Sequence, residues 1–404
     1  MPGREPALII SSGVGWMFDA MDVLLLSYIL AAAAQELGVG KAEAGLIILA
    51  NNVGMLIGAF LFGRLADAVG RKPVFMATLV LYSLGTGATA FARTAIDLAA
   101  VRLFTGLGLG GELPVAASLV SELSRPEHRG RNVVLLESFW SIGSIAAAAV
   151  AAFAFPAFGW RAPLLALSAT ALYALGVRAL VPESPLWLYK RDPALAARIA
   201  GEYGVPLAQP RAVKLSDMVR EYGAPTAAIW LSWLLLAFGY YGAFLWLPTM
   251  VAKRGYGLVA TFEYAFLMSL AQLPGYLTAA YLIDRLGRKP SIVLFFAGSA
   301  ASAVAFALAP STPALLAAGA ALNFFNLGVW GLIYAYTPEV YPTELRATAM
   351  GSAGSMARVG MILGPLLPAV AGFGEALAAY SAAWLAAAAV VAVLAPETKF
   401  SRKT

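Results

Sequence analysis

The chain has no cysteine and only one histidine, His128, among its 404 residues. Without cysteine there can be no disulfide, thiolate nucleophile, iron–sulfur cluster or cysteine–zinc site. A single histidine also excludes a metal site built from several imidazole ligands. The sequence also shows no pair of nucleophile and base that would indicate a membrane enzyme. It therefore predicts no enzymatic activity, no metal and no cofactor.

Charged residues are scarce as well: they make up 12% of the chain, where soluble domains carry roughly 25%. Hydrophobic residues account for 60%. A bilayer is the natural solvent for this composition, since each spanning helix needs about 20 mostly apolar residues. The net charge of +6 comes from basic residues between the apolar runs, so it indicates membrane topology and no nucleic-acid partner.

Apolar runs bounded by charged residues or by Gly and Pro predict twelve spanning helices and an all-α membrane protein. They are 8–34, 45–63, 74–92, 96–120, 131–154 and 162–180, then 226–250, 262–283, 291–309, 312–336, 347–370 and 375–395. The first run is too long for a signal-peptide core, so we expect it to be retained. Gly54-xxx-Gly58 and Gly360-xxx-Gly364 predict close helix packing.

Basic residues predict the orientation. With both termini inside, 20 of them would lie on the cytoplasmic side and five outside. The outer five are Lys41, Arg93, Arg161, Lys253 and Arg254. By the positive-inside rule, we expect a multi-pass protein of the plasma membrane with both termini in the cytoplasm.

Charged motifs occur twice along the chain, at a nearly constant spacing of 217 residues. They are 67–73 with 284–290, 127–129 with 344–346 and, at a spacing of 214, 182–183 with 396–397. Repeats of this kind predict two parallel copies of one structural unit. We expect an N-terminal six-helix bundle at 1–182, a cytoplasmic linker at 183–225 and a C-terminal six-helix bundle at 226–404.

The repeated motif is what relates the chain to a known family. Gly63-Arg-Leu-Ala-Asp-Ala-Val-Gly-Arg-Lys72 resembles the signature loop of the major facilitator superfamily. The segments 102–110, 126–130 and 182–185 are similar to its sugar-porter and organic-ion branch. The resemblance covers nearly the whole chain, and it implies two pseudo-symmetric six-helix bundles that expose a central site alternately to each side of the membrane.

Within that branch the chain is most similar to bacterial nicotinate transporters. The segments 15–22, 110–116 and 136–140 carry this resemblance, and 356–360 resembles the arginine-bearing segment of organic-anion carriers. It implies import of a small organic acid, most of all nicotinate, together with protons. Another aromatic acid, a sugar or an organic cation stays an alternative, as does a non-transporting receptor on the same scaffold. We expect a monomer in the lipid bilayer.

Charges inside predicted helices cost free energy in a membrane, so they usually face a cavity or a partner. Asp19 and Asp22 share a face of the first helix and repel, which suits a proton-coupled carrier. Arg102 lies at a depth comparable to that of Asp22, which also allows a static ion pair. We predict a proton-coupling group of Asp19, Asp22, Arg102, Glu112 and Glu137, any of which could instead be structural.

Arg358 is the candidate for binding a substrate carboxylate, because a guanidinium is permanently charged and matches a carboxylate in shape. An ion pair with Glu112 or Glu137 is the alternative. Buried amides need partners, and aromatic rings can stack on a planar substrate, although most aromatic residues in membrane helices serve packing. The predicted substrate-binding residues are Arg358, Asn323, Asn326, Gln272, Tyr240, Tyr241, Trp330 and Trp140.

The repeated basic loops are candidates for a cytoplasmic gate, a role that the family resemblance implies. Their residues could equally serve only topology and packing. We place Asp67 near a helix N-terminus, where the helix dipole would favour it. The predicted gate residues are Asp67, Arg71, Glu122, Arg129, Asp284, Arg288, Glu344 and Arg346.

Overall fold

The structure is a computed structural model, and it describes residues 4–125, 129–173, 176, 181–189, 191–207, 215–342 and 345–398. The described residues form helices and their connections, with no strand among them. The chain divides into two compact units, unit 1 from Met1 to Gln209 and unit 2 from Pro210 to Thr404. The predicted boundaries of a separate linker at 183–225 stay a prediction.

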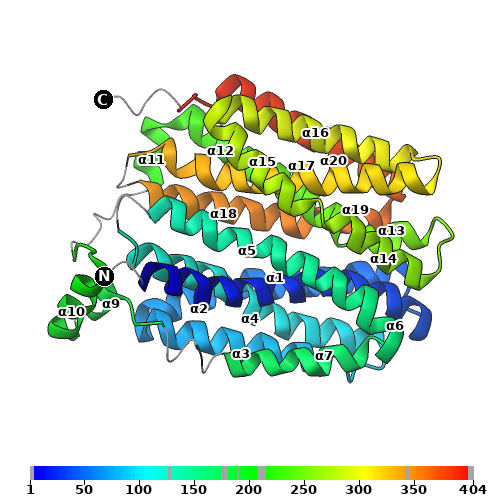
Figure 1. Cartoon of the computed structure of the whole chain (residues 1–404), viewed down its shortest axis with the longest axis horizontal. Helices are drawn as coiled ribbons and strands as arrows, with labels where there is room; N and C mark the ends of the chain where they lie inside the picture. The colour runs from blue at the N-terminus through cyan, green and yellow to red at the C-terminus, as the bar shows by residue number, and fades with distance from the viewer. Residues whose placement is uncertain are drawn as a thin grey trace. The chain divides into compact units, whose positions relative to one another are not determined.

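Unit 1 is a bundle of long helices that run side by side (Figure 1). They are α1 (Arg4–Glu36), α2 (Lys41–Val69), α3 (Arg71–Thr89), α4 (Ala95–Glu122), α5 (Arg129–Ala149), a π-helical turn (Val150–Ala154), α6 (Phe155–Phe158), α7 (Arg161–Leu167) and a 3-10 turn (Ser168–Leu172). Two short helices, α9 (Pro185–Leu188) and α10 (Pro193–Tyr203), follow.

Unit 2 contains the same kind of bundle, with more interruptions. Its helices are α11 (Leu215–Glu221), α12 (Gly223–Phe244), α13 (Leu247–Ala252), α14 (Leu258–Ser269), α15 (Gln272–Arg285), α16 (Arg288–Leu308), α17 (Thr312–Glu339), α18 (Arg346–Leu363), α19 (Leu366–Val370) and α20 (Phe373–Leu394). Three predicted spans are therefore each broken into two helices. Pro248, Pro274 and Pro365 lie at the breaks, because proline has no N–H to continue the helical hydrogen bonds.

Glycines bring neighbouring helices into backbone contact. In unit 1, a Cβ at Gly58 of α2 would collide with the backbone of Leu107 on α4. In unit 2, a Cβ at Gly364 of α18 would collide with the carbonyl of Phe238 on α12. These contacts show that the two predicted glycine motifs are packing seams, as small residues allow in membrane helices.

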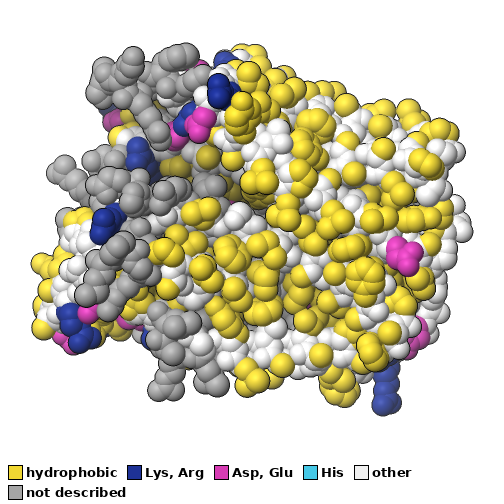
Figure 2. All heavy atoms as spheres, viewed as in Figure 1, with side chains coloured by type: hydrophobic (Ala, Val, Ile, Leu, Met, Phe, Trp, Pro, Cys, Tyr) yellow, Lys and Arg dark blue, Asp and Glu magenta, His cyan; other side chains and the backbone are white. Residues whose placement is uncertain are grey.

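Nine helices in the described part of the chain are long and apolar enough to cross a membrane. Helices α3 and α4 and the apolar segment that begins at Arg161 bring the number to the predicted twelve. Figure 2 shows hydrophobic side chains over the middle of the helices on the visible face, with most of the visible charged side chains near helix ends. This distribution fits a bilayer as the surrounding solvent.

Candidate functional site

A buried ion pair joins α1 and α4 inside unit 1. Asp22 is 3% exposed and Arg102 is 0% exposed. The guanidinium of Arg102 donates to both carboxylate oxygens of Asp22, with Nη2–Oδ2 at 2.8 Å and Nη1–Oδ1 at 3.3 Å. Its Nε donates to Oδ1 of Asn51 on α2 at 3.2 Å, and the Thr86 hydroxyl on α3 donates to Asp22 at 2.5 Å. Four helices thus converge on one compensated charge pair.

Three further carboxyl groups are buried in unit 1: Asp19 and Glu112 are 0% exposed, and Glu137 is 4% exposed. Glu112 of α4 lies against Gly15 of α1, where a Cβ would come within 2.7 Å of its Oε1. The hydroxyl of Tyr82 on α3 lies beside the same carboxyl. The structure therefore brings most of the predicted proton-coupling group together around α1, α3 and α4, while Glu137 lies on α5.

The fifth helix carries an aromatic residue from the predicted substrate-binding group. Trp140 of α5 is 6% exposed, and its ring centroid lies 5.0 Å from that of Trp16 on α1. This places Trp140 in the packing between α1 and α5.

Unit 2 has amides where unit 1 has charges. Gln272 of α15 donates from Nε2 to Oδ1 of Asn323 on α17 at 2.8 Å. The Asn323 amide donates in turn to the carbonyl of Gly319 at 2.8 Å. These two predicted substrate-binding residues therefore hold α15 and α17 together.

Asn326 and Trp330 differ from that pair, because their polar atoms have no hydrogen-bond partner among the described residues. Asn326 is 0% exposed and Trp330 is 8% exposed. They lie four residues apart on α17 and therefore on the same face. The ring of Tyr240 on α12 meets that of Trp330 edge to face, with centroids 5.8 Å apart. Buried polar atoms normally find a partner, so these atoms of unit 2 are available to bind a ligand.

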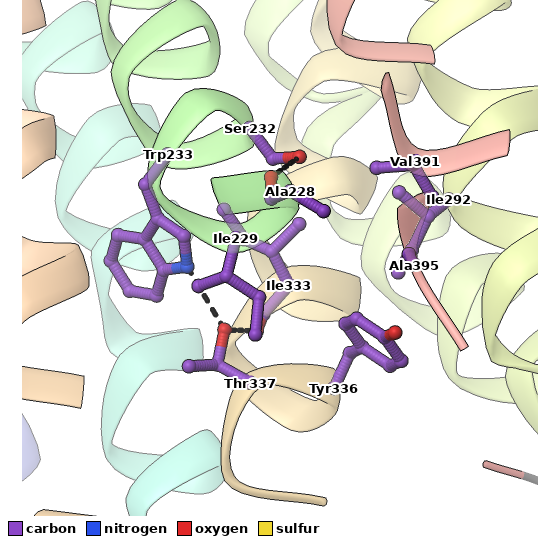
Figure 3. A pocket seen from close by; sticks show the side chains of 10 residues that line it. All are labelled: Ala228, Ile229, Ser232, Trp233, Ile292, Ile333, Tyr336, Thr337, Val391 and Ala395. Carbon is purple, nitrogen blue, oxygen red and sulfur yellow. Dashed lines mark hydrogen bonds between the residues drawn. The ribbon is translucent and has the colours of Figure 1, made fainter. Parts of the chain in front are cut away.

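A small cavity lies next to these aromatic residues, between α12, α16, α17 and α20 (Figure 3). Its volume is about 10 Å³, room for about one water molecule. The indole of Trp233 donates to Thr337 at 2.9 Å, and the Ser232 hydroxyl donates to the Ala228 carbonyl, so its polar groups are satisfied locally (Figure 3). This cavity is too small for an organic acid and is a gap in the packing of unit 2.

Arg358 and Tyr241, the remaining predicted substrate-binding residues, are both partly exposed in unit 2. Arg358 lies in the second half of α18, and Tyr241 lies near the end of α12, its ring 5.1 Å from that of Tyr240. Helix α18 itself carries no acidic residue.

The repeated basic motif forms a polar cluster at one end of each unit. In unit 1, Arg71 bonds to Asp67 at 2.9 Å and lies 3.6 Å from Glu122, which also accepts a hydrogen bond from the Ser184 hydroxyl. Glu183 accepts hydrogen bonds from the backbone N–H of Arg71 at 2.9 Å and of the next residue at 3.3 Å. Glu183 thereby caps the N-terminus of α3, where the helix dipole favours an anion.

Unit 2 repeats this cluster with a stronger ion pair. Arg288 donates to both oxygens of Glu339, with Nε–Oε2 at 2.7 Å and Nη2–Oε1 at 3.0 Å, and contacts Asp284 at 3.2 Å. Glu397 accepts from the backbone N–H groups of Arg288 and Lys289, both at 3.0 Å. Gly287 precedes α16 with φ +109°, a backbone conformation that favours glycine.

The dipole argument for Asp67 is wrong. Asp67 lies in the last turn of α2, a C-terminal end, and Glu183 holds the N-terminal position instead. Arg346 is exposed and donates to the Tyr341 carbonyl at 3.2 Å. The side chain of Arg129 and all of Glu344 lie outside the described residues.

Several residues of these clusters were missing from the sequence prediction. Glu339 stands 217 positions after Glu122, so the repeat itself could have identified it. Glu183 and Glu397 were visible as part of a repeated Pro-Glu pair, but their capping role needs the three-dimensional contact. In the interior of unit 1, Tyr82 beside Glu112 was also not predicted, since a single tyrosine in an apolar helix is normally a packing residue.

These features define a polytopic membrane protein built from two repeated helical bundles, each with a charged cluster at one end. The sequence profile of the Major Facilitator Superfamily matches residues 12–365 and, in a second match, 264–403. The chain belongs to this superfamily and is a membrane transporter, not an enzyme.

Relatives match along nearly the whole chain. A Bacillus subtilis protein named for niacin/nicotinamide transport is 44% identical over 403 residues, which cover 98% of each chain. The niacin transporter of Acinetobacter baylyi is 41% identical over 407 residues, 96% of this chain and 93% of that one. A solved structure of the xylose transporter of E. coli has the same fold, with a TM-score of 0.79 at 17% identity over 98% of this chain and 99% of that one.

Proposed function

We propose that the protein imports nicotinate together with protons by alternating access. The observation that carries the substrate is the identity of 44% and 41% to relatives named for niacin transport, along nearly the whole chain. Transporters of this fold bind substrate near the membrane midplane and expose it alternately to each side. The protein works in the plasma membrane as a monomer, with both termini in the cytoplasm.

Unit 2 supplies the groups that match nicotinate. Arg358 forms a two-pronged contact with the carboxylate, since a guanidinium fits a carboxylate in shape and charge. Asn326 and Trp330 offer buried donors to the ring nitrogen of the substrate, and their partnerless polar atoms support this role. Tyr240 and Tyr241 provide aromatic faces beside them.

Unit 1 supplies the groups for proton coupling. Its interior holds four buried carboxyl groups, Asp19, Asp22, Glu112 and Glu137, and the buried Arg102 is paired to Asp22. Burial in an apolar interior favours the protonated form of a carboxyl group over the ionised form. The clusters at the basic ends of the two units serve as the cytoplasmic gate.

Uptake into proteoliposomes tests the substrate. Labelled nicotinate should accumulate inside when the outside is more acidic, and the accumulation should collapse with a protonophore. A neutral substrate is the second candidate, because one relative is named for nicotinamide as well as niacin. Nicotinamide, which keeps the ring and loses the charge, is therefore the matched competitor. Equal competition by nicotinamide and nicotinate would replace the organic-acid proposal with a neutral one.

Cysteine labelling tests the orientation in a chain that has no cysteine of its own. A cysteine at Lys41 or Lys253 should react with an impermeant reagent from outside. One at Arg198 on α10 should react only after permeabilisation. Labelling of Arg198→Cys in intact cells would overturn the cytoplasmic placement of the termini.

A further inference from the structure

Glu112 is a buried acidic residue that takes no part in the Asp22–Arg102 ion pair of unit 1. It is 0% exposed in the middle of unit 1. It lies ten residues after Arg102 on α4, which is about 15 Å along the helix axis. The described acceptors of the Arg102 side chain are Asp22 and Asn51, so that guanidinium is committed elsewhere.

The surroundings of Glu112 are apolar or acidic. From α1, Gly15 lies against its Oε1, and Asp19 and Asp22 are the titratable groups on that helix nearby. From α3, the ring of Phe75 approaches the same side, and the Tyr82 hydroxyl lies beside the carboxyl. No donor in the described part of the chain forms a hydrogen bond with either carboxyl oxygen in this structure.

Two more titratable groups complete the neighbourhood. Tyr173 is close enough for Glu112 to act on it electrostatically, and its hydroxyl donates to the Ser11 carbonyl at 2.6 Å. Glu137, on the fifth helix, is 4% exposed. None of these groups is a cation, so nothing among the described neighbours compensates a negative charge on Glu112.

Asp22 has the opposite environment, with a guanidinium on both oxygens and a hydroxyl donor at 2.5 Å. An isolated carboxylate without such partners costs many kcal/mol in an apolar interior, and the group stays neutral instead. The two carboxyl groups therefore differ in their surroundings: Asp22 contacts a cation and a hydroxyl donor, and Glu112 has no cation beside it.

We propose that Glu112 is the group that carries the transported proton, with the Tyr82 hydroxyl beside it and Gly15 as the contact that keeps water out. This inference rests on the proposed proton symport. On release, the O–H bond of the Glu112 carboxyl breaks, and the proton passes to a water molecule. The carboxylate that remains needs hydration, and water reaches it only when α1 moves away from α4 at Gly15.

This geometry links the proton to the position of α1. While Glu112 is neutral, the helix backbone at Gly15 packs directly on the carboxyl. Ionisation favours the conformation in which that contact opens. Because α1 also carries Asp22, whose pair with Arg102 spans α1 and α4, a shift of α1 would strain that pair and oppose release until the substrate site changes.

Infrared difference spectroscopy on the reconstituted full-length protein tests this directly. Titration of the wild type should show the carbonyl-stretch band of a protonated carboxyl. Glu112→Gln should remove that band, while Glu263→Gln, an exposed glutamate of α14, should leave it in place. A band that persists in Glu112→Gln would overturn the assignment. If Glu112→Gln does not yield folded protein, Glu112→Asp should keep the band but shift its frequency.

Transport separates this inference from the proposed function. Nicotinate affinity in the wild type should fall about tenfold per pH unit over the range where substrate binding takes up one proton. Glu112→Gln should bind and exchange nicotinate with no such dependence, and its accumulation should stop at equal concentrations on both sides. If Glu112→Gln still accumulates nicotinate with pH, the proton binds elsewhere and symport stands. If the wild type does not transport nicotinate but Glu112→Gln still removes the band, the substrate proposal fails and the proton site stands.

Discussion

The two units share their backbone packing but differ in what that packing encloses. In unit 1, Gly58 packs on Leu107, and 217 positions later Gly275 packs on Phe324 in unit 2. The interior polar residues do not follow this repeat. Unit 1 has Asp22, Asn51 and Arg102, and the corresponding positions of unit 2 are Gly239, Met268 and Gly319. Met268 fills the space beside Gly319, and Trp384 fills the space beside Gly239.

This difference teaches that the repeat preserves helix contacts and leaves the chemistry free to diverge. Where unit 1 places an ion pair and extra carboxyl groups, unit 2 places sulfur, aromatic rings and amides. In the function proposed above, this difference divides the work of a proton-coupled carrier. We propose that the proton is handled in unit 1 and the organic substrate in unit 2.

The largest expected effect comes from breaking the charged interior of unit 1. Arg102→Ala leaves the buried Asp22 without its cation, and removing one partner of a buried pair costs about 3–5 kcal/mol. We therefore expect a large drop in the thermal midpoint of the purified protein. Arg358→Ala, at a partly exposed arginine of unit 2, is the control and should shift the midpoint little. Similar losses in both variants would contradict the claim that the buried Asp22–Arg102 pair contributes more to stability than the charge of Arg358.

The next effect concerns substrate charge in unit 2. Arg358→Ala should weaken nicotinate binding about 10- to 100-fold, since a hydrogen bond to a charged group contributes about 1.5–3 kcal/mol. Arg358→Lys keeps the charge but loses the planar fork, so its affinity should lie between the two. Equilibrium binding of labelled nicotinate measures this. Full binding by Arg358→Ala would move carboxylate recognition out of unit 2.

The sequence predicted the outer frame of this comparison better than its interior. Composition, basic loops and the repeat were enough for twelve helices and two bundles, because each is a property of residue type and spacing. The helix breaks at Pro248 and Pro365 were not predicted. Each proline lies inside a long apolar run and interrupts the helix over about one turn only, so the hydrophobic pattern continues across it. The sequence also placed Asp22 and Arg102 at similar depth, but it could not show that Asn51 and Thr86 complete that pair. Those contacts depend on how four helices rotate against one another.

A smaller effect is expected for recognition of the substrate ring. Benzoate resembles nicotinate but lacks the ring nitrogen, so it leaves a buried donor of unit 2 without a partner. Leaving a buried polar group unsatisfied costs about 1–3 kcal/mol, so the wild type should prefer nicotinate about 5- to 150-fold. Asn326→Leu should reduce that preference mainly by weakening nicotinate. Asn323→Leu, whose wild-type amide bonds within the protein, is the comparison variant, and an equal loss of preference there would contradict a specific role for Asn326.

The smallest effects belong to the basic ends, where the two units are most alike. Asp67 and Asp284 contact the repeated arginines, but their side chains are 71% and 77% exposed. Exposed ion pairs contribute under about 1 kcal/mol, so Asp67→Asn and Asp284→Asn should each change the thermal midpoint only slightly.

Glu122 and Glu339, the glutamates that contact the repeated arginines, should differ in how much they contribute to stability. Glu339 receives two hydrogen bonds from Arg288, whereas Glu122 lies 3.6 Å from Arg71 and bonds to Ser184 as well. Glu339→Gln should therefore destabilise the protein more than Glu122→Gln, because it removes a two-pronged charged contact from an arginine whose side chain is only 9% exposed. If both ends also form the cytoplasmic gate, Glu339→Gln should increase cysteine labelling from the cytoplasmic side more than Glu122→Gln does. Equal midpoints and equal labelling for the two variants would show that the ends are energetically equivalent, and that the asymmetry between the units is confined to their interiors.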